Sequence, residues 1–184
     1  MNAAANATDG AGAGVTRNSA LAEQADAHGH YVVECRDASG NLKWTDEIEN
    51  LVTTVGKNFA LDTFLAGSGF TATWFIGLIS ATGYTAVAAT DTIASHAGWT
   101  EDQNYTQTAR PTAAFSAASA GSKALSSALT FSMNASTTIK GCFLNSVATK
   151  GGTTGTLYSA GLFTGGDKVL ASGDSLSVSY TASL

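Results

Sequence analysis

The sequence predicts a mainly β fold: an antiparallel β-sandwich or jelly roll with one inserted helix and an extended N-terminal arm. Three observations predict it. Short segments that alternate apolar and polar residues recur from residue 30 to the end of the chain. Gly-rich turns separate these segments, as in sandwiches and jelly rolls. Only residues 54–66 carry apolar residues near helical spacing. The 184 residues suit one domain, residues 30–184, preceded by an arm, residues 1–29.

The arm has no β pattern and hardly any large apolar side chain. Residues 18–27 would suit a short helix with Ser19 as its N-cap, but they hold too few apolar residues to dock unaided. Val15 and Leu21 are the only branched apolar residues of the arm. We therefore expect the arm to gain order only by lying on another surface.

The domain opens with a predicted hairpin and the helix. Residues 30–36 read as a strand, residues 37–41 as a turn rich in Asp, Gly and Asn, and residues 42–44 as its returning strand. The helix 54–66 is predicted to be amphipathic, with Gly67 as its C-terminal cap. Its apolar residues are Val55, Phe59, Leu61, Phe64 and Leu65.

The remaining segments read as β-strands around one long connection, residues 80–111. The expected strands are residues 71–79, 112–119, 128–134, 136–148, 156–163, a short piece after the turn 164–168, and 174–184. The segment 136–148 is apolar on both faces, which indicates a central strand. The last segment alternates throughout, with one apolar and one Ser/Thr face, as in an antiparallel sheet.

Charge is scarce and unevenly distributed. Charged residues make up 12% of the chain, about half the usual share. Either other subunits cover much of the surface, or the surface is simply rich in Ser and Thr. Twelve of the 14 acids lie in residues 1–102. The bases of the second half are spread out without interleaved aromatic residues, which argues against a nucleic-acid surface.

The two cysteines, Cys35 and Cys142, lie in segments of strand character far apart in sequence. Two cysteines make neither a disulfide framework nor a metal site, so we expect buried free thiols. The N-terminus lacks the basic and apolar regions of a signal peptide, and no apolar run is long enough to span a bilayer. We expect synthesis in the cytoplasm and no membrane partner.

Motifs for catalysis or cofactor binding are weak. The pair His28–His30 has no third ligand nearby in sequence, so no metal is expected. No G-x-S-x-G elbow is present, and the acidic pairs 46–47 and 101–102 would point apart on extended chain. The Gly-rich 151–156 lacks the Lys and helix of a phosphate loop and reads as a hairpin turn. We expect no cofactor and no enzymatic activity.

The stretch ASHAGWTEDQNYTQTARP, residues 94–111, is the most chemically varied part of the chain. Trp99 and Tyr105 are expected to pin the loop onto the sandwich. Arg110 is expected to fix the exit of the loop by pairing with Glu101 or Asp102. We expect a structural or interface loop rather than a catalytic one.

Several blocks of the sequence together resemble a family of tailed-bacteriophage virion structural proteins. These blocks are VECRDASGNLKWTDEIENLVTTVGKN (33–58), TATWFIGLI (71–79), ASHAGWTED-x2-Y (94–105), ARP (109–111) and TKGGTTGTLYSAGLFTGGDK (149–168). By analogy, the resemblance implies a capsid decoration, or cement, protein on the virion surface. The implied partners are the major capsid protein and further copies of this chain, as a homodimer or homotrimer. The expected contact residues are Val15, Leu21, Trp99, Tyr105 and Arg110.

Three other functions stay open from the sequence. The first is a virion protein of the neck or tail, although the chain lacks the repeats of a fibre shaft. The second is a carbohydrate-binding jelly roll in which Trp99 and Tyr105 would stack on a sugar. The third is an enzyme in which His96 and Glu101 would act as a base and its orienting group.

Overall fold

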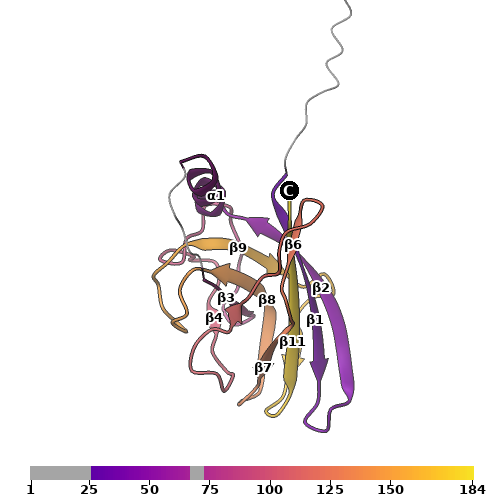
Figure 1. The fold of residues 1–184 in the computed structure, drawn as a ribbon. Helices are drawn as coiled ribbons and strands as arrows, with labels where there is room; N and C mark the ends of the chain where they lie inside the picture. The colour runs from indigo at the N-terminus through magenta and orange to yellow at the C-terminus, as the bar shows by residue number, and fades with distance from the viewer. Residues whose placement is uncertain (1–25, 67–72) are drawn as a thin grey trace, which may run out of the picture.

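A computed structural model describes residues 26–66 and 73–184 (Figure 1). These residues form one helix and eleven strands, in agreement with the predicted antiparallel β fold with one inserted helix. The strands join in one open sheet with the order β4-β3-β8-β9-β2-β1-β11-β6, while β5, β7 and β10 pair alongside. The sheet folds over itself into two facing layers. The expected contact residues Val15 and Leu21, and the expected helix cap Gly67, lie outside the described residues.

The first layer is built around strands β1 (His28–Arg36), β2 (Leu42–Val52) and β11 (Ser175–Ser183). Strand β1 lies between the other two and is antiparallel to both. The turn between β1 and β2 forms as predicted, because Asp37 Oδ1 accepts hydrogen bonds from the backbone N–H groups of Ser39 and Asn41. Two short strands, β6 (Ser122–Ala124) and β7 (Leu129–Ser132), pair with β11.

Strand β2 is much longer than the three residues expected and joins the two layers. Its first part pairs with β1, and its last residues, Asn50–Val52, pair with β9 (Leu157–Leu162) of the second layer. The acids of the segment Asp46–Glu49 do not interrupt this strand. Glu47 and Glu49 lie on its exposed face, whereas Asp46 shares the inner face with fully buried Ile48 and is paired there with Lys168.

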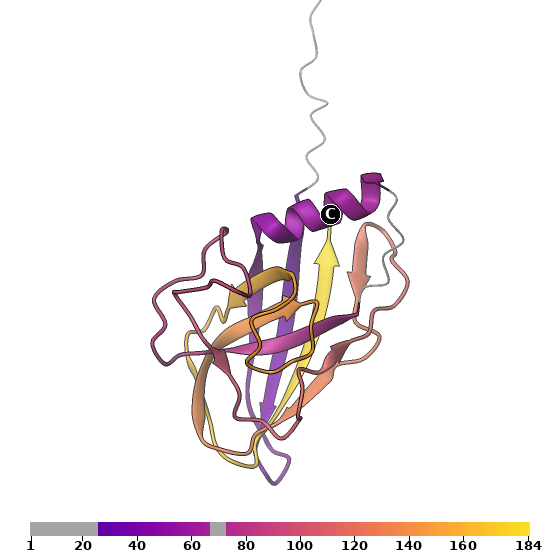
Figure 2. The same cartoon turned by 90° about the vertical axis from the view of Figure 1, so that its left-hand side faces the viewer.

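The second layer holds β3 (Trp74–Ser80), β8 (Thr137–Asn145) and β9, with β8 in the centre as predicted. The short strands β4 (Glu101–Asp102), β5 (Thr112–Ala113) and β10 (Lys168–Leu170) lie at its margins. The strand predicted at 112–119 is thus only two residues long in this region. In Figure 2 the magenta strand β3 crosses in front of the indigo and yellow strands β1 and β11.

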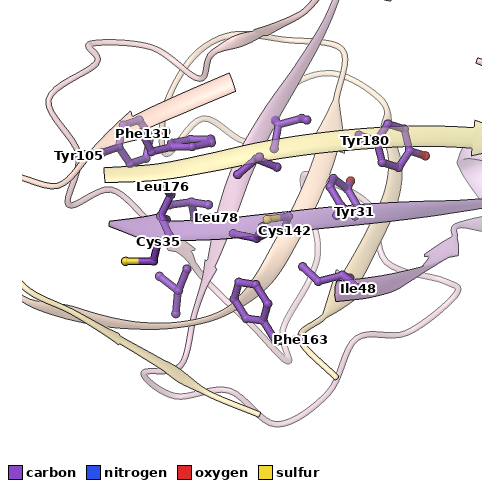
Figure 3. Close-up of a cluster of buried hydrophobic side chains, with 14 of the residues drawn as sticks. Tyr31, Cys35, Ile48, Leu78, Tyr105, Phe131, Cys142, Phe163, Leu176 and Tyr180 are labelled. Carbon is purple, nitrogen blue, oxygen red and sulfur yellow. The ribbon is translucent and has the colours of Figure 1, made fainter. Parts of the chain in front are cut away.

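The space between the layers is the main hydrophobic core (Figure 3). Strands β1 and β11 fill it with the predicted alternating residues, among them Tyr31, Val33, Cys35, Leu176, Val178 and Tyr180. The opposing layer contributes residues of β3 and β8, including Leu78, Ile139, Cys142 and Leu144. A register shift between Ile79 and Ser80 places Ile139 on the same side as Cys142, although strict two-residue alternation along the strand would place them on opposite faces. Both cysteines are buried and free, as expected.

Helix α1 (Thr54–Ala66) has the predicted bounds. Buried Thr53 is its N-cap, and its Oγ1 accepts a hydrogen bond of 3.0 Å from the N–H of Gly56. The first half of the helix packs on β9, where Gly56 lies so close to the Tyr158 carbonyl that a side chain would collide with it. Figures 1 and 2 show that α1 lies at the same end of the molecule as the C-terminus and the start of β1.

Candidate partner-binding surface

The long connection between β3 and β5 covers the outer face of the second layer. Trp99 is the centre of this cover, since its ring packs 5.2 Å from the ring of Phe143 on the outward side of β8. Five buried residues surround it: Ile79, Ile93, Phe143, Leu157 and Ala160. Trp99 Nε1 donates a hydrogen bond of 2.9 Å to Asp91, and the His96 ring stacks on the indole at 4.0 Å. The connection therefore forms a second, smaller core.

A buried ion pair closes this connection. Arg110 Nε and Nη2 donate to the two carboxylate oxygens of Glu101 at 2.9 and 2.8 Å. The same guanidinium also donates to the carbonyls of Val147 and Gly152 in the β8–β9 loop, at 2.9 and 3.1 Å. Glu101 in turn accepts from the backbone N–H of Gly151. The predicted pairing of Arg110 with Glu101 is thus confirmed, and it ties two loops together.

Tyr105 anchors the second half of the connection. Its ring packs edge-on to Phe131 at 5.0 Å, and the Lys150 ammonium lies 4.0 Å from its ring centroid. Burial, with a smaller contribution from the Glu101 carboxylate, raises the pKa of the Tyr105 hydroxyl. The hydroxyl therefore stays protonated and directs a long contact of 3.5 Å to Glu101. Trp99 and Tyr105 are internal anchors, as the sequence suggested.

The same burial corrects the expectation that these residues contact a partner. Trp99, Tyr105 and Arg110 are only 2%, 0% and 2% exposed. A partner cannot reach side chains that are enclosed by the chain itself, so their role is to hold the shape of the loop. The carbohydrate hypothesis loses its argument for the same reason, since neither aromatic ring is available to stack on a sugar.

The pair suggested for catalysis is also engaged elsewhere. His96 Nδ1 donates to the carbonyl of Trp99 at 2.8 Å, and both oxygens of Glu101 accept from Arg110. A small cavity of ≈ 200 Å³ lies between these groups, lined by Ile93, His96, Trp99, Thr100, Glu101, Gln103, Arg110, Gly151, Gly152 and Thr153. The described contacts of His96 and Glu101 thus serve the packing of the loop.

The structure instead exposes an apolar surface on α1, which we call the α1 face: Leu61, Phe64 and Leu65. These side chains are 55%, 85% and 74% exposed. They lie at positions i, i+3 and i+4, so they share one side of the helix. The sequence predicted an amphipathic helix. In the structure Phe59 contacts Trp74 of β3, whereas the three side chains of the α1 face remain exposed to solvent.

An apolar groove runs beside the α1 face. Its volume is ≈ 840 Å³, which is within the range of ligand and peptide sites. It is lined by aromatic and small residues of α1, β3, β5, β6, β9 and β11 and their flanks: Phe59, Ala60, Thr63, Phe64, Thr73, Trp74, Thr112, Ala113, Ala114, Phe115, Lys123, Leu144, Tyr158, Tyr180 and Ala182. Lys123 is the one ionisable cation among these residues, and its ammonium donates to the Ser116 carbonyl at 2.8 Å.

The α1 face and the groove together form the candidate partner-binding surface. The sequence does not reveal this surface, because helical spacing is the same for an apolar stripe that packs inward and for one that faces water. One feature of the sequence indicates how the helix lies: Gly56 in its first half has no side chain and can approach the sheet closely. The large apolar residues lie mostly in the second half of the helix.

Among residues 26–66 and 73–184, no three His, Cys, Asp or Glu side chains gather closely enough to hold a metal ion. His30 lies near two acids, Glu47 at 3.4 Å and Glu49 at 3.9 Å, which makes a surface ion-pair arrangement. In the same described part of the chain, no helix has the length and apolar character needed to cross a bilayer.

Comparison with known proteins adds no family to these observations. No protein-family profile matches the chain, and no curated protein sequence matches it significantly.

Proposed function

We propose that this protein is a bacteriophage capsid decoration, or cement, protein. It binds the outer surface of the head and stabilises the contacts between major capsid protein subunits. The proposal draws on the resemblance of five sequence blocks within residues 33–168 to phage virion structural proteins. It draws equally on a surface that suits a protein partner.

The α1 face is the observation that carries the proposal. Three large apolar side chains stand in water on one helix, in a chain with only 12% charged residues. Clustered exposed apolar groups mark protein–protein interaction sites. Burying each of them against a partner contributes about 1.5–3 kcal/mol before the costs of association are subtracted. One such contact is weak, but many copies on a lattice add their effects.

The rest of the fold suits a rigid clamp. The buried Arg110–Glu101 pair and the Trp99 cluster fix the long connection, so the domain meets a partner without ordering a large loop. The arm, residues 1–29, would extend the contact onto a neighbouring capsid subunit. Symmetric association of the decoration protein into dimers or trimers would match the symmetry of the capsid lattice.

The test uses purified particles and a matched pair of variants. Phe64→Asp places a charge on the α1 face, while Val169→Asp makes the same change at another exposed apolar residue, 69% exposed on β10. We expect gel densitometry of wild-type particles to give a simple ratio to the major capsid protein, such as one, one half or one third. Phe64→Asp should lower that ratio at least about tenfold, because a charge buried in an apolar contact costs several kcal/mol. Val169→Asp should retain it.

Three results would contradict the proposal in different ways. A handful of copies per particle would place the protein in the neck or tail. Absence from the particle would remove the virion role altogether. Equal loss with Phe64→Asp and Val169→Asp would show that the α1 face is not the contact surface.

A further inference from the structure

We propose that residues 18–25 dock in the apolar groove of their own chain, with Leu21 among the aromatic rings and Glu23 beside Lys123. The inference concerns the isolated protein and does not depend on the proposed function. The groove would thus be occupied by a segment of the same chain, and that segment would gain order there before any partner is present.

Strand register places the groove within reach of this segment. Gly29 of β1 is paired with Ala182 of β11, and Ala182 is paired with Lys123 of β6. Ala182 and Lys123 both line the groove. Neighbouring strands are about 4.8 Å apart, so Gly29 lies about 10 Å from Lys123. Figure 2 shows α1, the C-terminus and the start of β1 at the same end of the molecule.

The length of the intervening chain fits this distance. The described chain begins at Asp26, two residues before β1, and Leu21 precedes Asp26 by five residues. Five residues span up to about 17 Å when extended. An extended segment that turns back from Asp26 therefore reaches the groove. Because the connection is short, the effective concentration of the segment at its own groove is about millimolar or higher, well above that of a second copy in dilute solution.

The chemistry of the segment matches that of the groove. The groove presents aromatic side chains, including Phe59, Trp74 and Phe115, and it has one cation, Lys123. Among residues 18–25, Leu21 is the one large apolar side chain and Glu23 the one charge. In an extended chain these residues, two apart, point to the same side. This spacing therefore places the apolar side chain of Leu21 and the carboxylate of Glu23 on the same side of an extended segment.

Lys123 is available for this contact. Of the described residues, its ammonium contacts the Ser116 carbonyl and none of the carboxylates. Lys123 is exposed to solvent, and the other residues that line the groove are apolar or hydroxyl-bearing. A carboxylate at this position would form a charge-assisted hydrogen bond. The side chain of Leu21 would displace water from the aromatic rings beside this contact.

Disulfide trapping in the full-length protein tests the docking. Ala22→Cys, which keeps both Leu21 and Glu23, is combined with Ala114→Cys, an exposed position that lines the groove. The control combines Ala22→Cys with Glu49→Cys, an exposed position of β2 that is paired with His30 of β1 and therefore lies close to the segment but outside the groove. Native Cys35 and Cys142 are buried and do not compete. We expect an intramolecular disulfide in the groove pair to form at least about tenfold faster than in the control.

A charge exchange then tests the orientation of the segment. Glu23→Lys should slow formation of the groove disulfide, and Glu23→Lys combined with Lys123→Glu should restore it, because the swapped pair attracts again. Equal rates in the groove and control pairs would overturn the proposal and leave the groove to another occupant. Disulfide-linked dimers instead of monomers would assign the groove to a second copy and would also overturn it. A charge exchange without effect would remove the Glu23–Lys123 contact.

Discussion

Replacing Arg110 should destabilise the protein strongly, because its buried guanidinium pairs with Glu101 and ties two loops together. In the folded chain the Arg110 side chain is 1% exposed and its partner Glu101 is 6% exposed. Replacing Arg110 by Met keeps much of the volume and removes the charge. The Glu101 carboxylate is then left buried with only the Gly151 N–H and the long Tyr105 contact as donors. The carbonyls of Val147 and Gly152 also lose their donor.

The expected loss is about 4 kcal/mol. Breaking a buried ion pair by removing one partner costs roughly 3–5 kcal/mol, because an unpaired charge stays in a poorly solvated site. The matched variant is Arg110→Met combined with Glu101→Gln, which removes the stranded charge. This double variant should be about 2 kcal/mol more stable than Arg110→Met alone, since a neutral amide costs less to bury than a carboxylate.

Urea unfolding followed by circular dichroism measures both effects as differences in the free energy of unfolding. Tryptophan fluorescence gives a second probe, because Trp99 lies in the cluster that the ion pair closes. A loss below about 1 kcal/mol for Arg110→Met would refute the reasoning, as that is the value of a solvent-exposed pair. The reasoning would also be refuted if the double variant lost as much unfolding free energy as Arg110→Met and Glu101→Gln lose in sum, since additivity would show that the two side chains do not interact.

Two further predictions concern ionisation. Burial alone would raise the pKa of Asp46, but hydrogen bonds from Lys168 and Thr164, and from backbone N–H groups, outweigh it and lower the pKa from 3.8 to about 2. The contact therefore contributes stability above pH 3.8 that is lost as the pH falls towards 2. Asp46→Asn should lower the free energy of unfolding by about 2 kcal/mol at pH 7 and by nearly nothing at pH 2. The same difference between wild type and variant at every pH would contradict this prediction. Burial, aided by Asp174, raises the pKa of Cys35 to about 11, and burial raises the pKa of Cys142. Both thiols should thus react with a thiol reagent at pH 8 at least about a hundredfold more slowly in the native protein than in urea, and labelling of the native protein at the unfolded rate would disprove their burial.

Local patterns in the sequence determined the elements that depend on neighbouring residues. The β1–β2 turn follows from Asp37 and the Asn and Gly residues after it, because their side chains and backbone freedom suit a tight turn. The alternation in β11 and the two apolar faces of β8 follow from the two-residue period of a strand. The bounds of α1 follow from the helical spacing of its apolar residues, and the structure adds Thr53 as its N-cap.

Other features depend on which distant segments meet, and only the tertiary structure decided them. The two apolar faces of β8 require a cover on each side, but nothing local indicates that Trp99, more than forty residues earlier, supplies the outer one. Long-range packing also encloses Tyr105, in the main core, and Arg110, which the sequence had offered as contact residues. It also leaves Leu61, Phe64 and Leu65 in water, because α1 is held to the sheet by its first half. Periodicity shows that a set of side chains shares a face, whereas burial of that face depends on the surface that long-range packing places against it.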